Sequence, residues 1–317
     1  MQTLSDEQVR RLLAPAKAAA LIEAAFARDY RATAGMPVRT QLEIPSLGVL
    51  LLMPCHDRAL PALGIKLVTV QEQPRPGVER VQALYLLLDS ETGQHKALMA
   101  ANALTDLRTA ATSAVATKYL ARPEAKTLGL FGAGRQARSH LAVLPAVRPF
   151  ERVLVCGSSA ARSEEFARRF ASECACPLEP AEPRRLVEQS EVICTCTTAR
   201  EPLFDGRWLR AGTHLNLVGA FQPAAREVDD ETIRRARVVV DTYEGALAEA
   251  GDLLIPLGRG VVTREHIVAD LHEIVSGSKR GRTTAEDITV FKSVGCALED
   301  LVTAAFVYDE AARQGLL

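Results

Sequence analysis

The chain has 317 residues, 48% hydrophobic and 24% charged, so it is long enough for two domains and has the composition of a globular enzyme. Lys+Arg 38 and Asp+Glu 39 give a formal net charge of −1, which offers no electrostatic basis for binding nucleic acid or an anionic membrane. No apolar run approaches the ~20 residues of a membrane span, and the charged N-terminus lacks a signal-peptide core, so we expect a soluble cytoplasmic protein.

The first hundred residues predict a helix followed by consecutive strands. Residues 15–32 have the apolar spacing of an amphipathic helix. Runs bounded by glycine and proline predict strands at 39–44, 48–54, 64–70 and 81–89, with PRPG at 74–77 as a loop and 105–120 as a connecting helix. Because no helices separate these strands, we expect an antiparallel or mixed sheet in an α+β domain.

The segment after residue 120 alternates strands and helices, as a doubly wound parallel sheet requires. Strands are predicted at 127–131, 152–157, 191–197, 213–219 and 236–242. Apolar residues at steps of three or four then predict a long C-terminal helix: Phe291, Val294, Leu298, Leu301, Ala305 and Tyr308. We therefore expect a Rossmann-type dinucleotide-binding domain over 115–290, and a substrate-binding and dimerisation domain formed by 1–114 with 291–317.

The seven cysteines predict thiols in a reducing compartment, not a disulfide framework. Two pairs have C-x-C spacing, Cys174 with Cys176 and Cys194 with Cys196. Neither pair has the C-x-x-C spacing or the nearby histidine that would suit zinc. We therefore expect small apolar fillers and no metal site.

The strand at 127–131 passes through a glycine-rich turn directly into a helical pattern. Gly132 permits a tight turn, Gly134 permits close approach of a ligand to the backbone, and Ala137 is the third small position of the dinucleotide fingerprint. The N–H groups that open the helix would bind a pyrophosphate. An ordinary βα turn is the alternative. The expected cofactor contacts of this turn are Gly132, Ala133, Gly134, Arg135 and Gln136.

Three cations in the first domain suit an anionic substrate. Lys66 lies inside the apolar run GIKLVTV, where a charge costs free energy unless it faces a cleft or a partner. Arg39 and Arg108 could grip a carboxylate with two hydrogen bonds each. The structural alternatives are an ion pair of Lys66 with a buried acid or snorkelling of its side chain, and surface salt bridges for the two arginines.

Several segments in order resemble the ornithine cyclodeaminase/mu-crystallin family of NAD(P)-dependent enzymes. These are GIKLVTV (64–70), LRTAATSAVATKYLAR (107–122), LGLFGAGRQA (128–137), VGAFQPAAREVDDE (218–231), EAGDLLIP (249–256) and TVFKSVGCALED (289–300). The resemblance implies a two-domain homodimer with the active site in the cleft between the domains, and a small amino-acid-like or cyclic imine substrate.

The resemblance also carries over individual roles. Arg39, Lys66 and Arg108 match substrate-binding positions, with Lys66 as the catalytic candidate and Arg108 also expected at the cofactor. Gln82 matches a position near the nicotinamide, and the alternative is a polar sheet residue that faces solvent. Glu249 matches a position near the substrate.

The coenzyme contacts expected elsewhere lie at strand ends. An NAD enzyme usually has an acid after the second strand, whereas this chain has Ser158, Ser159 and then Arg162, which favours NADP over NAD. Ligands of open α/β sheets bind at the carboxyl ends of the strands. We therefore expect further cofactor contacts from Thr197, Thr198, Val218 and Lys292, although Lys292 could instead cover a helix with its aliphatic stem.

Phe221 is the informative departure from the family. Cyclodeaminases carry an aspartate there as an acid/base, and such a group typically contributes 10²–10⁴-fold to the rate. Phe221 could instead form an apolar wall beside a flat cyclic imine. The sequence therefore favours NADPH-dependent reduction of Δ1-pyrroline-2-carboxylate or Δ1-piperideine-2-carboxylate. Ornithine cyclodeaminase and a non-catalytic NADP- or ligand-binding protein are the alternatives.

Overall fold

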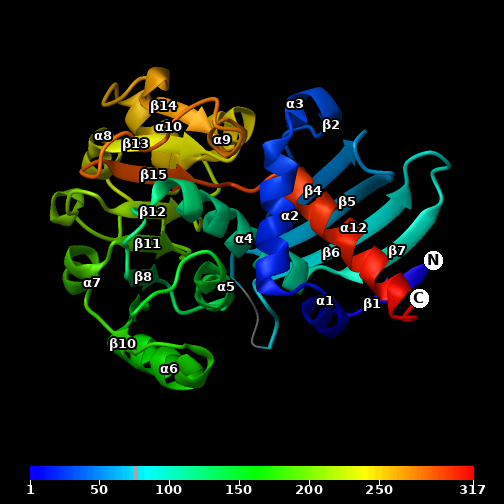
Figure 1. Ribbon diagram of the computed structural model, residues 1–317, viewed down its shortest axis with the longest axis horizontal. Helices are drawn as coiled ribbons and strands as arrows, with labels where there is room; N and C mark the ends of the chain where they lie inside the picture. Colours follow the sequence, from blue (N-terminus) through cyan, green and yellow to red (C-terminus); the bar gives the residue numbers. More distant parts are fainter. Residues whose placement is uncertain (74–76) are drawn as a thin grey trace. The chain divides into compact units, whose positions relative to one another are not determined.

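A computed structural model of the chain describes residues 1–73 and 77–317 and divides into two compact units (Figure 1). Unit 1 comprises Met1–Arg108 and Cys296–Leu317, and unit 2 comprises Thr109–Gly295. Apart from Gly77, the loop predicted at 74–77 lies outside the described residues. Within the described ranges, no helix combines the length and the apolar character that crossing a membrane would need. The roles expected for the two units stay predictions.

Unit 1 is built on a curved sheet that is seven-stranded in its described residues. The strand order is β1-β7-β6-β5-β4-β2, with β3 paired to β4; β1 runs parallel to β7 and the other pairs are antiparallel. The mixed sheet expected from the sequence is confirmed. Its strands are β1 (Gln2–Leu4), β2 (Ala34–Gly35), β3 (Thr40–Ile44), β4 (Gly48–Asp57), β5 (Ala62–Gln71), β6 (Val81–Asp89) and β7 (His95–Ala100).

The helices of unit 1 cover one face of this sheet. Helix α12 packs against α2 and against β4, β5 and β6. Burial alternates along β4 and β5, because successive side chains point to opposite faces and the helices cover one of them. The helices are α1 (Asp6–Leu12), α2 (Pro15–Ala27), α3 (Tyr30–Thr33) and α12 (Ala297–Arg313), and α4 (Asn102–Leu120) carries the chain into unit 2.

The predicted start of the C-terminal helix is wrong. Phe291 belongs to a strand, Ile288–Lys292, and Val294 lies in the connection before α12 begins at Ala297. The strand is buried along its whole length, as a central parallel strand is, so its apolar run has no alternation that would distinguish it from a helix. Gly295, with φ +80°, separates the two elements.

Unit 2, all of whose residues are described, forms an eight-stranded sheet in the order β10-β9-β8-β11-β12-β15-β13-β14. All its pairs are parallel, and the order reverses at β8, which confirms the Rossmann-type fold. The strands are β8 (Thr127–Phe131), β9 (Arg152–Cys156), β10 (Leu178–Pro180), β11 (Val192–Thr195), β12 (His214–Leu217), β13 (Ala236–Val240), β14 (Ile267–Asp270) and β15 (Ile288–Lys292).

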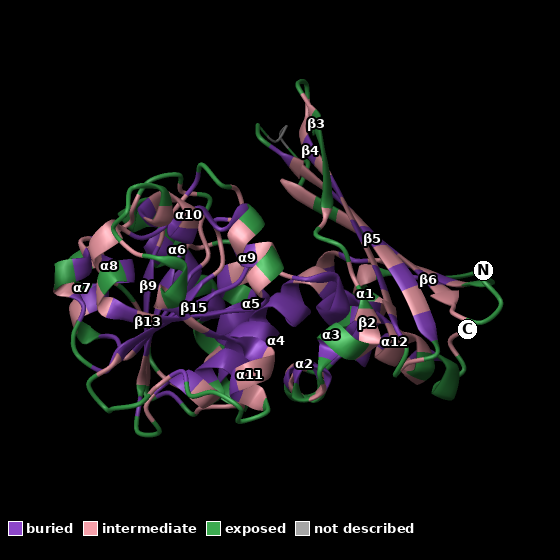
Figure 2. Ribbon diagram, turned by 90° about the horizontal axis from the view of Figure 1, so that it is seen from above, coloured by how far each residue is buried: buried purple, intermediate pink, exposed green. Residues whose placement is uncertain are grey.

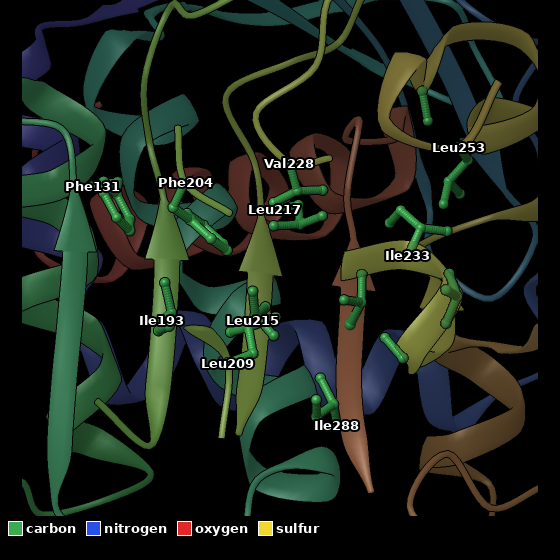
Figure 3. Close-up of a cluster of buried hydrophobic side chains, with 14 of the residues drawn as sticks. Phe131, Ile193, Phe204, Leu209, Leu215, Leu217, Val228, Ile233, Leu253 and Ile288 are labelled. Atoms are coloured by element: carbon green, nitrogen blue, oxygen red, sulfur yellow. The ribbon is translucent and has the colours of Figure 1, made fainter. Parts of the chain in front are cut away.

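The strands of unit 2 are buried by helices and loops, as the colours of β13 and β15 in Figure 2 show. The helices are α5 (Arg135–Val143), α6 (Ala160–Phe170), α7 (Pro183–Gln189), α8 (Asp230–Arg235), α9 (Tyr243–Glu249), α10 (Gly251–Gly258) and α11 (Leu271–Val275). Ile193 and Leu215 lie on neighbouring strands in the core shown in Figure 3, and Leu253 of α10 packs into the same core. This packing fixes the carboxyl edge of the sheet.

Candidate active site

The turn between β8 and α5 has the geometry of a phosphate-binding loop. Gly132 has φ +109°, and a Cβ atom built on it would lie 2.5 Å from the carbonyl oxygen of Cys196. Gly134 is exposed, caps α5 without a side-chain hydrogen bond, and has open space where a Cβ would be. The half-buried Ala133, Arg135 and Gln136 complete the turn. An open helix N-terminus without a competing cap fits a dinucleotide pyrophosphate.

The end of β9 lies against this turn. A Cβ atom on Gly157 would be 3.3 Å from the Cβ of Ala133 and 3.0 Å from that of Arg162. Ser158, Ser159 and Arg162 are all exposed. The Ser159 hydroxyl accepts a hydrogen bond from the Arg162 backbone N–H at 3.3 Å and caps α6. The end of β9 therefore presents two hydroxyl groups and a guanidinium group beside the glycine turn.

The residues expected after β11 and β12 are organised by a carboxylate that the sequence analysis did not single out. Glu227 is fully buried and accepts hydrogen bonds from the hydroxyls of Thr195 and Thr197, both at 2.7 Å. It also accepts from the backbone N–H groups of Thr197 at 2.8 Å, Gly219 at 2.7 Å and Ala220 at 3.3 Å. The ends of β11 and β12 are therefore joined through one side chain.

The other residues of unit 2 that were expected at the coenzyme or the substrate occupy different environments. Thr198 is exposed and Val218 is half-buried. Phe221 packs against the hydrophobic core of unit 2 and is partly buried, while Glu249 is buried at the end of α9.

Lys292 is part of a buried ion pair. It is fully buried on β15, and its Nζ lies 2.9 Å from Oδ2 of Asp252 and donates to the carbonyl oxygen of Ala220. Asp252 in turn accepts from the backbone N–H groups of Glu227 at 2.7 Å and Val228 at 3.1 Å. Lys292 therefore supports the loop after β12 in the structure, and the cofactor contact expected from the sequence stays a prediction.

The charges of Asp252 and Lys292 act in opposite directions on the pKa of Glu227. Burial and the neighbouring Asp252 raise the pKa of Glu227, whereas Lys292 and the two threonine donors act in the opposite direction. Since the contacts that hold Glu227 all come from donors, the geometry suits its carboxylate form.

In unit 1, Lys66 and Arg108 share one buried carboxylate. Nζ of Lys66 lies 2.8 Å from Oδ1 and 2.7 Å from Oδ2 of Asp300. Nε of Arg108 lies 3.0 Å from Oδ1 of Asp300, and its NH1 lies 2.7 Å from Oε2 of Glu299. Both acids have no exposed surface. The ion pair that the sequence analysis kept as an alternative for Lys66 is therefore present.

These contacts determine the protonation of the two cations. Burial, followed by the positive charge of Arg108, lowers the pKa of Lys66 to about 8, although Asp300 and Glu299 raise it. For Arg108, burial alone would lower the pKa, but the two acids outweigh it and hold the pKa above its ordinary value. Lys66 therefore titrates near pH 8, while Arg108 stays charged.

The structure places Gln82 and Arg39 differently relative to Lys66. Gln82 pairs with Thr69 and is exposed, so it lies on the face of the sheet opposite to Lys66. Arg39 precedes β3 by one residue, outside its pairing with β4, which begins with Thr40 opposite Leu52. Continuing that register by one position would bring Arg39 opposite Met53, the partner of Lys66. Two strand spacings would then separate the backbones of Arg39 and Lys66 by about 10 Å.

The sequence carried a weak signal for the acids that it did not identify. Glu299 and Asp300 stand between Leu298 and Leu301, which were both assigned to the buried stripe of the helix. A charged pair beside core positions is unusual unless it has partners. Glu227 and Asp252 lie 25 residues apart, so no local pattern joins them.

The buried histidines and the cysteines take structural places. His140 contacts the Gln136 carbonyl oxygen at 2.8 Å and the Ser113 hydroxyl at 2.9 Å. His214 contacts Thr289 at 3.0 Å and Asn216 at 3.2 Å. All seven cysteines, each in the described part of the chain, are free thiols.

Comparison with known proteins identifies the family of the chain. Residues 1–315 match the model of the ornithine cyclodeaminase/mu-crystallin family. The chain is 39% identical to mouse ketimine reductase mu-crystallin over 294 residues, 91% of this chain and 90% of that protein.

Solved structures agree over nearly the full length. The structure of Thermococcus litoralis Δ1-pyrroline-2-carboxylate reductase with NADH and L-proline superimposes with a TM-score of 0.97 at 40% identity, covering 99% of this chain and 98% of that one. An archaeal alanine dehydrogenase dimer with bound NAD has a TM-score of 0.93 at 31% identity and covers 99% and 97%. The chain therefore belongs to the ornithine cyclodeaminase/mu-crystallin family.

Proposed function

We propose that this protein is an NAD(P)H-dependent reductase of a small cyclic imino acid, Δ1-pyrroline-2-carboxylate or Δ1-piperideine-2-carboxylate, and forms the cyclic amino acid. The observation that carries the proposal is the buried cluster in which Lys66 and Arg108 share Asp300. The mouse and Thermococcus litoralis relatives, named as a ketimine reductase and a Δ1-pyrroline-2-carboxylate reductase, support the reaction type.

The charges of unit 1 suit a monoanionic substrate. Arg39, Lys66 and Arg108 supply three positive charges, and Glu299 with Asp300 supplies two negative ones. The excess positive charge would be neutralised by the carboxylate of the substrate, for which the arginines offer paired donors.

Reduction adds a hydride to the imine carbon and a proton to the ring nitrogen. A bound nicotinamide supplies the hydride. Lys66, whose pKa is lowered to about 8, is the group that can hold a proton beside the ring nitrogen at neutral pH. Since Lys66 and Arg108 are held rigidly by buried acids, positioning and electrostatics would supply most of the acceleration.

Phe221 separates this proposal from ornithine cyclodeaminase. A phenyl ring can neither accept a proton nor hold an ammonium group as the aspartate of the cyclodeaminases does. We therefore assign Phe221 to the apolar wall of the substrate site, and Glu249 to its margin. Ammonia release from ornithine with catalytic NAD⁺, without accumulation of NADH, would favour the cyclodeaminase instead.

The test is a steady-state assay of NADPH and NADH oxidation with five- and six-membered cyclic imino acids, ornithine and lysine. Lys66→Met is expected to abolish turnover while leaving coenzyme binding nearly unchanged. Lys118→Met, at an exposed position near the end of α4, is the control and should retain both. Loss of coenzyme binding together with turnover in Lys66→Met would make Lys66 a structural residue, and binding without turnover by the wild type would indicate a ligand-binding protein.

We propose NADP as the preferred coenzyme, with NAD possible. The exposed Ser158, Ser159 and Arg162 can contact a 2′-phosphate, whereas an acid at this strand end would repel it. Arg162→Ala should raise the KM for NADPH by about tenfold, the value of a charge-assisted hydrogen bond, and leave the KM for NADH unchanged. A wild-type enzyme with a lower KM for NADH would overturn the assignment.

We also propose a homodimer formed through the uncovered face of the unit 1 sheet. That face carries partly exposed leucine and isoleucine side chains opposite to the helix-covered face: Leu50, Leu52, Ile65, Leu67, Leu84 and Leu86. Leu84, which is 39% exposed, is the natural position for a test. Light scattering should give a mass of two chains for the wild type and of one chain for Leu84→Glu; a monomeric wild type contradicts the proposal.

We propose a cytoplasmic location on the basis of the cysteine content. The chain has seven cysteines, an odd number without the spacing of a disulfide framework, which suits a reducing compartment.

A further inference from the structure

We infer that Asp300 is the positioning residue that holds Lys66 in place and keeps it positively charged for the proposed reduction, on which this inference rests. The sequence gives only a weak signal for Asp300, which is a charged residue beside apolar positions of its helix. The argument comes from its two partners, from the other groups that face Lys66, and from the place of Lys66 in the sheet.

Asp300 holds two cations from different elements. Its Oδ1 accepts from Nζ of Lys66 on β5 at 2.8 Å and from Nε of Arg108 on α4 at 3.0 Å. Its Oδ2 lies 2.7 Å from Nζ of Lys66. A lysine ammonium can rotate freely, so contact with both carboxylate oxygens is what fixes its direction. Asp300 therefore orients Lys66 relative to the guanidinium of Arg108.

The ionised groups close to Lys66 come from α4 and α12. Arg108 supplies a positive charge, and Glu299 and Asp300 supply negative ones. Continuing the register of β3 would place the backbone of Arg39 about 10 Å away. Because burial and Arg108 both lower the pKa of Lys66, the acids must keep the ammonium form populated, and Asp300 is the acid in direct contact.

The titratable groups nearest to Lys66 on the neighbouring strands, Tyr85 and Cys55, carry no charge near neutral pH, whereas Asp57 at the end of β4 pairs with Arg28. Tyr85 pairs with Lys66 across β5 and β6, and its pKa is raised by burial and then by the charge of Asp300. Burial, followed by the charges of Asp57 and Asp300, raises the pKa of Cys55 on β4 to about 12. Neither group can therefore replace the charge of Asp300.

The side chain of Tyr85 is tightly packed beside Lys66. Its hydroxyl is buried and has no hydrogen-bond partner among the described residues. It lies over Gly64, where a Cβ atom would be 2.2 Å from it, so the glycine provides the room that the ring occupies. Tight packing leaves Lys66 little freedom to reach another acid, which makes its dependence on Asp300 stronger.

The experiment compares pH profiles of kcat/KM for Asp300→Asn and Glu299→Gln. Both variants remove one negative charge from the same turn of α12, but the Glu299 carboxylate lies on Arg108, not on Lys66. Loss of a contacting opposite charge shifts a pKa by about 1–3 units. We expect the alkaline limb, near pH 8 in the wild type, to move down by that amount in Asp300→Asn and by less than half as much in Glu299→Gln.

Two further variants separate this effect from damage to the fold. Asp57→Asn removes another buried acid of unit 1, one that pairs with Arg28 at 3.0 Å, and should leave the alkaline limb in place. Asp300→Glu retains the carboxylate and should keep the limb within about half a unit of the wild type, even if the rate falls. An unchanged limb in folded Asp300→Asn, or equal shifts in Asp300→Asn and Glu299→Gln, overturns the inference.

Direct titration of Lys66 by NMR, with its signal assigned from Lys66→Arg, makes the result independent of turnover. A Lys66 signal that titrates near pH 8 in the wild type and lower in Asp300→Asn supports the inference even if no imine is reduced, in which case the proposed function alone fails. If Asp300→Asn does not fold, the wild-type titration and Asp300→Glu decide the matter: a Lys66 that is already uncharged at pH 7 in the wild type, or a limb shifted by more than a unit in Asp300→Glu, overturns it.

Discussion

Glu227→Gln tests whether one buried carboxylate fixes the edge of the sheet where the coenzyme is proposed to bind. Glutamine has the same shape but replaces one accepting oxygen with an NH₂ group. Placed toward Gly219 and Ala220, that group would oppose two backbone donors. Placed toward Thr197, it would oppose the Thr197 backbone N–H, which donates to Glu227 at 2.8 Å, while the hydroxyl could turn to accept. The second orientation costs less, and it leaves one buried N–H without an acceptor.

An unsatisfied buried N–H costs about 1–3 kcal/mol, and the remaining hydrogen bonds lose their charge assistance. We therefore expect the free energy of unfolding in urea to fall by about 2–4 kcal/mol with an unchanged m-value. Because Thr197 and Gly219 would shift, the Kd for NADPH, measured by fluorescence titration, should rise by about tenfold or more.

Glu191→Gln is the matched control for Glu227→Gln. Glu191 accepts from the backbone N–H groups of Lys126 at 2.7 Å and Thr127 at 3.1 Å, before β11 and at the start of β8. Its replacement should also reduce stability but leave the Kd for NADPH unchanged. Equal losses of coenzyme affinity in the two variants would refute the reasoning. So would a free energy of unfolding of Glu227→Gln within about 0.5 kcal/mol of the wild type, which is the range of ordinary surface substitutions.

Three further predictions follow from other contacts. Gly132→Ala places a Cβ 2.5 Å from the Cys196 oxygen at φ +109° and should destabilise the protein by about 1–3 kcal/mol, whereas Gly134→Ala meets open space and should not; equal urea midpoints would contradict this. Lys292→Met leaves Asp252 buried without its cation and should cost about 3–5 kcal/mol in urea unfolding, against a negligible change for Lys118→Met. Burial, then Arg282, lowers the pKa of His214 to about 3, so below pH ~6.5 a proton binds this residue in the unfolded chain alone, and stability falls as the pH falls. The dependence of unfolding free energy on pH between 4.5 and 6 should therefore be shallower in His214→Gln by about 1.4 kcal/mol per unit, and an unchanged slope would exclude His214 as the cause.

The Rossmann-type unit could be predicted because its signals are local. A buried strand, a glycine turn and a helix follow one another at 127–143, and each element is short enough to be recognised by its own pattern. The strand Ile288–Lys292 was not predicted from its local pattern. It comes from a later part of the chain and is inserted between β12 and β13. Nothing near it in the sequence reveals that insertion.

The candidate site was predictable where a residue conflicts with its surroundings. Lys66 in an apolar strand and Phe221 in place of an acid are such conflicts, and each can be read from a few neighbours. Glu299 and Asp300 do not stand out in this way, because acids in the first turn of a helix are common and usually face solvent, where they interact favourably with the helix dipole. Their pairing with Lys66 and Arg108 depends on tertiary contacts between segments far apart in the chain.

The separation of these partners has a consequence for synthesis on the ribosome. Asp300 follows Lys66 by 234 residues and Arg108 by 192. At a translation rate of about 5–20 residues per second, roughly 10–40 s pass between the synthesis of Arg108 and that of Asp300. An emerging N-terminal segment thus contains two basic groups that it cannot bury, and its sheet must stay incompletely consolidated until the final helix leaves the exit tunnel. Nascent chains arrested before residue 297 should accordingly be cleaved readily by a protease within the first hundred residues.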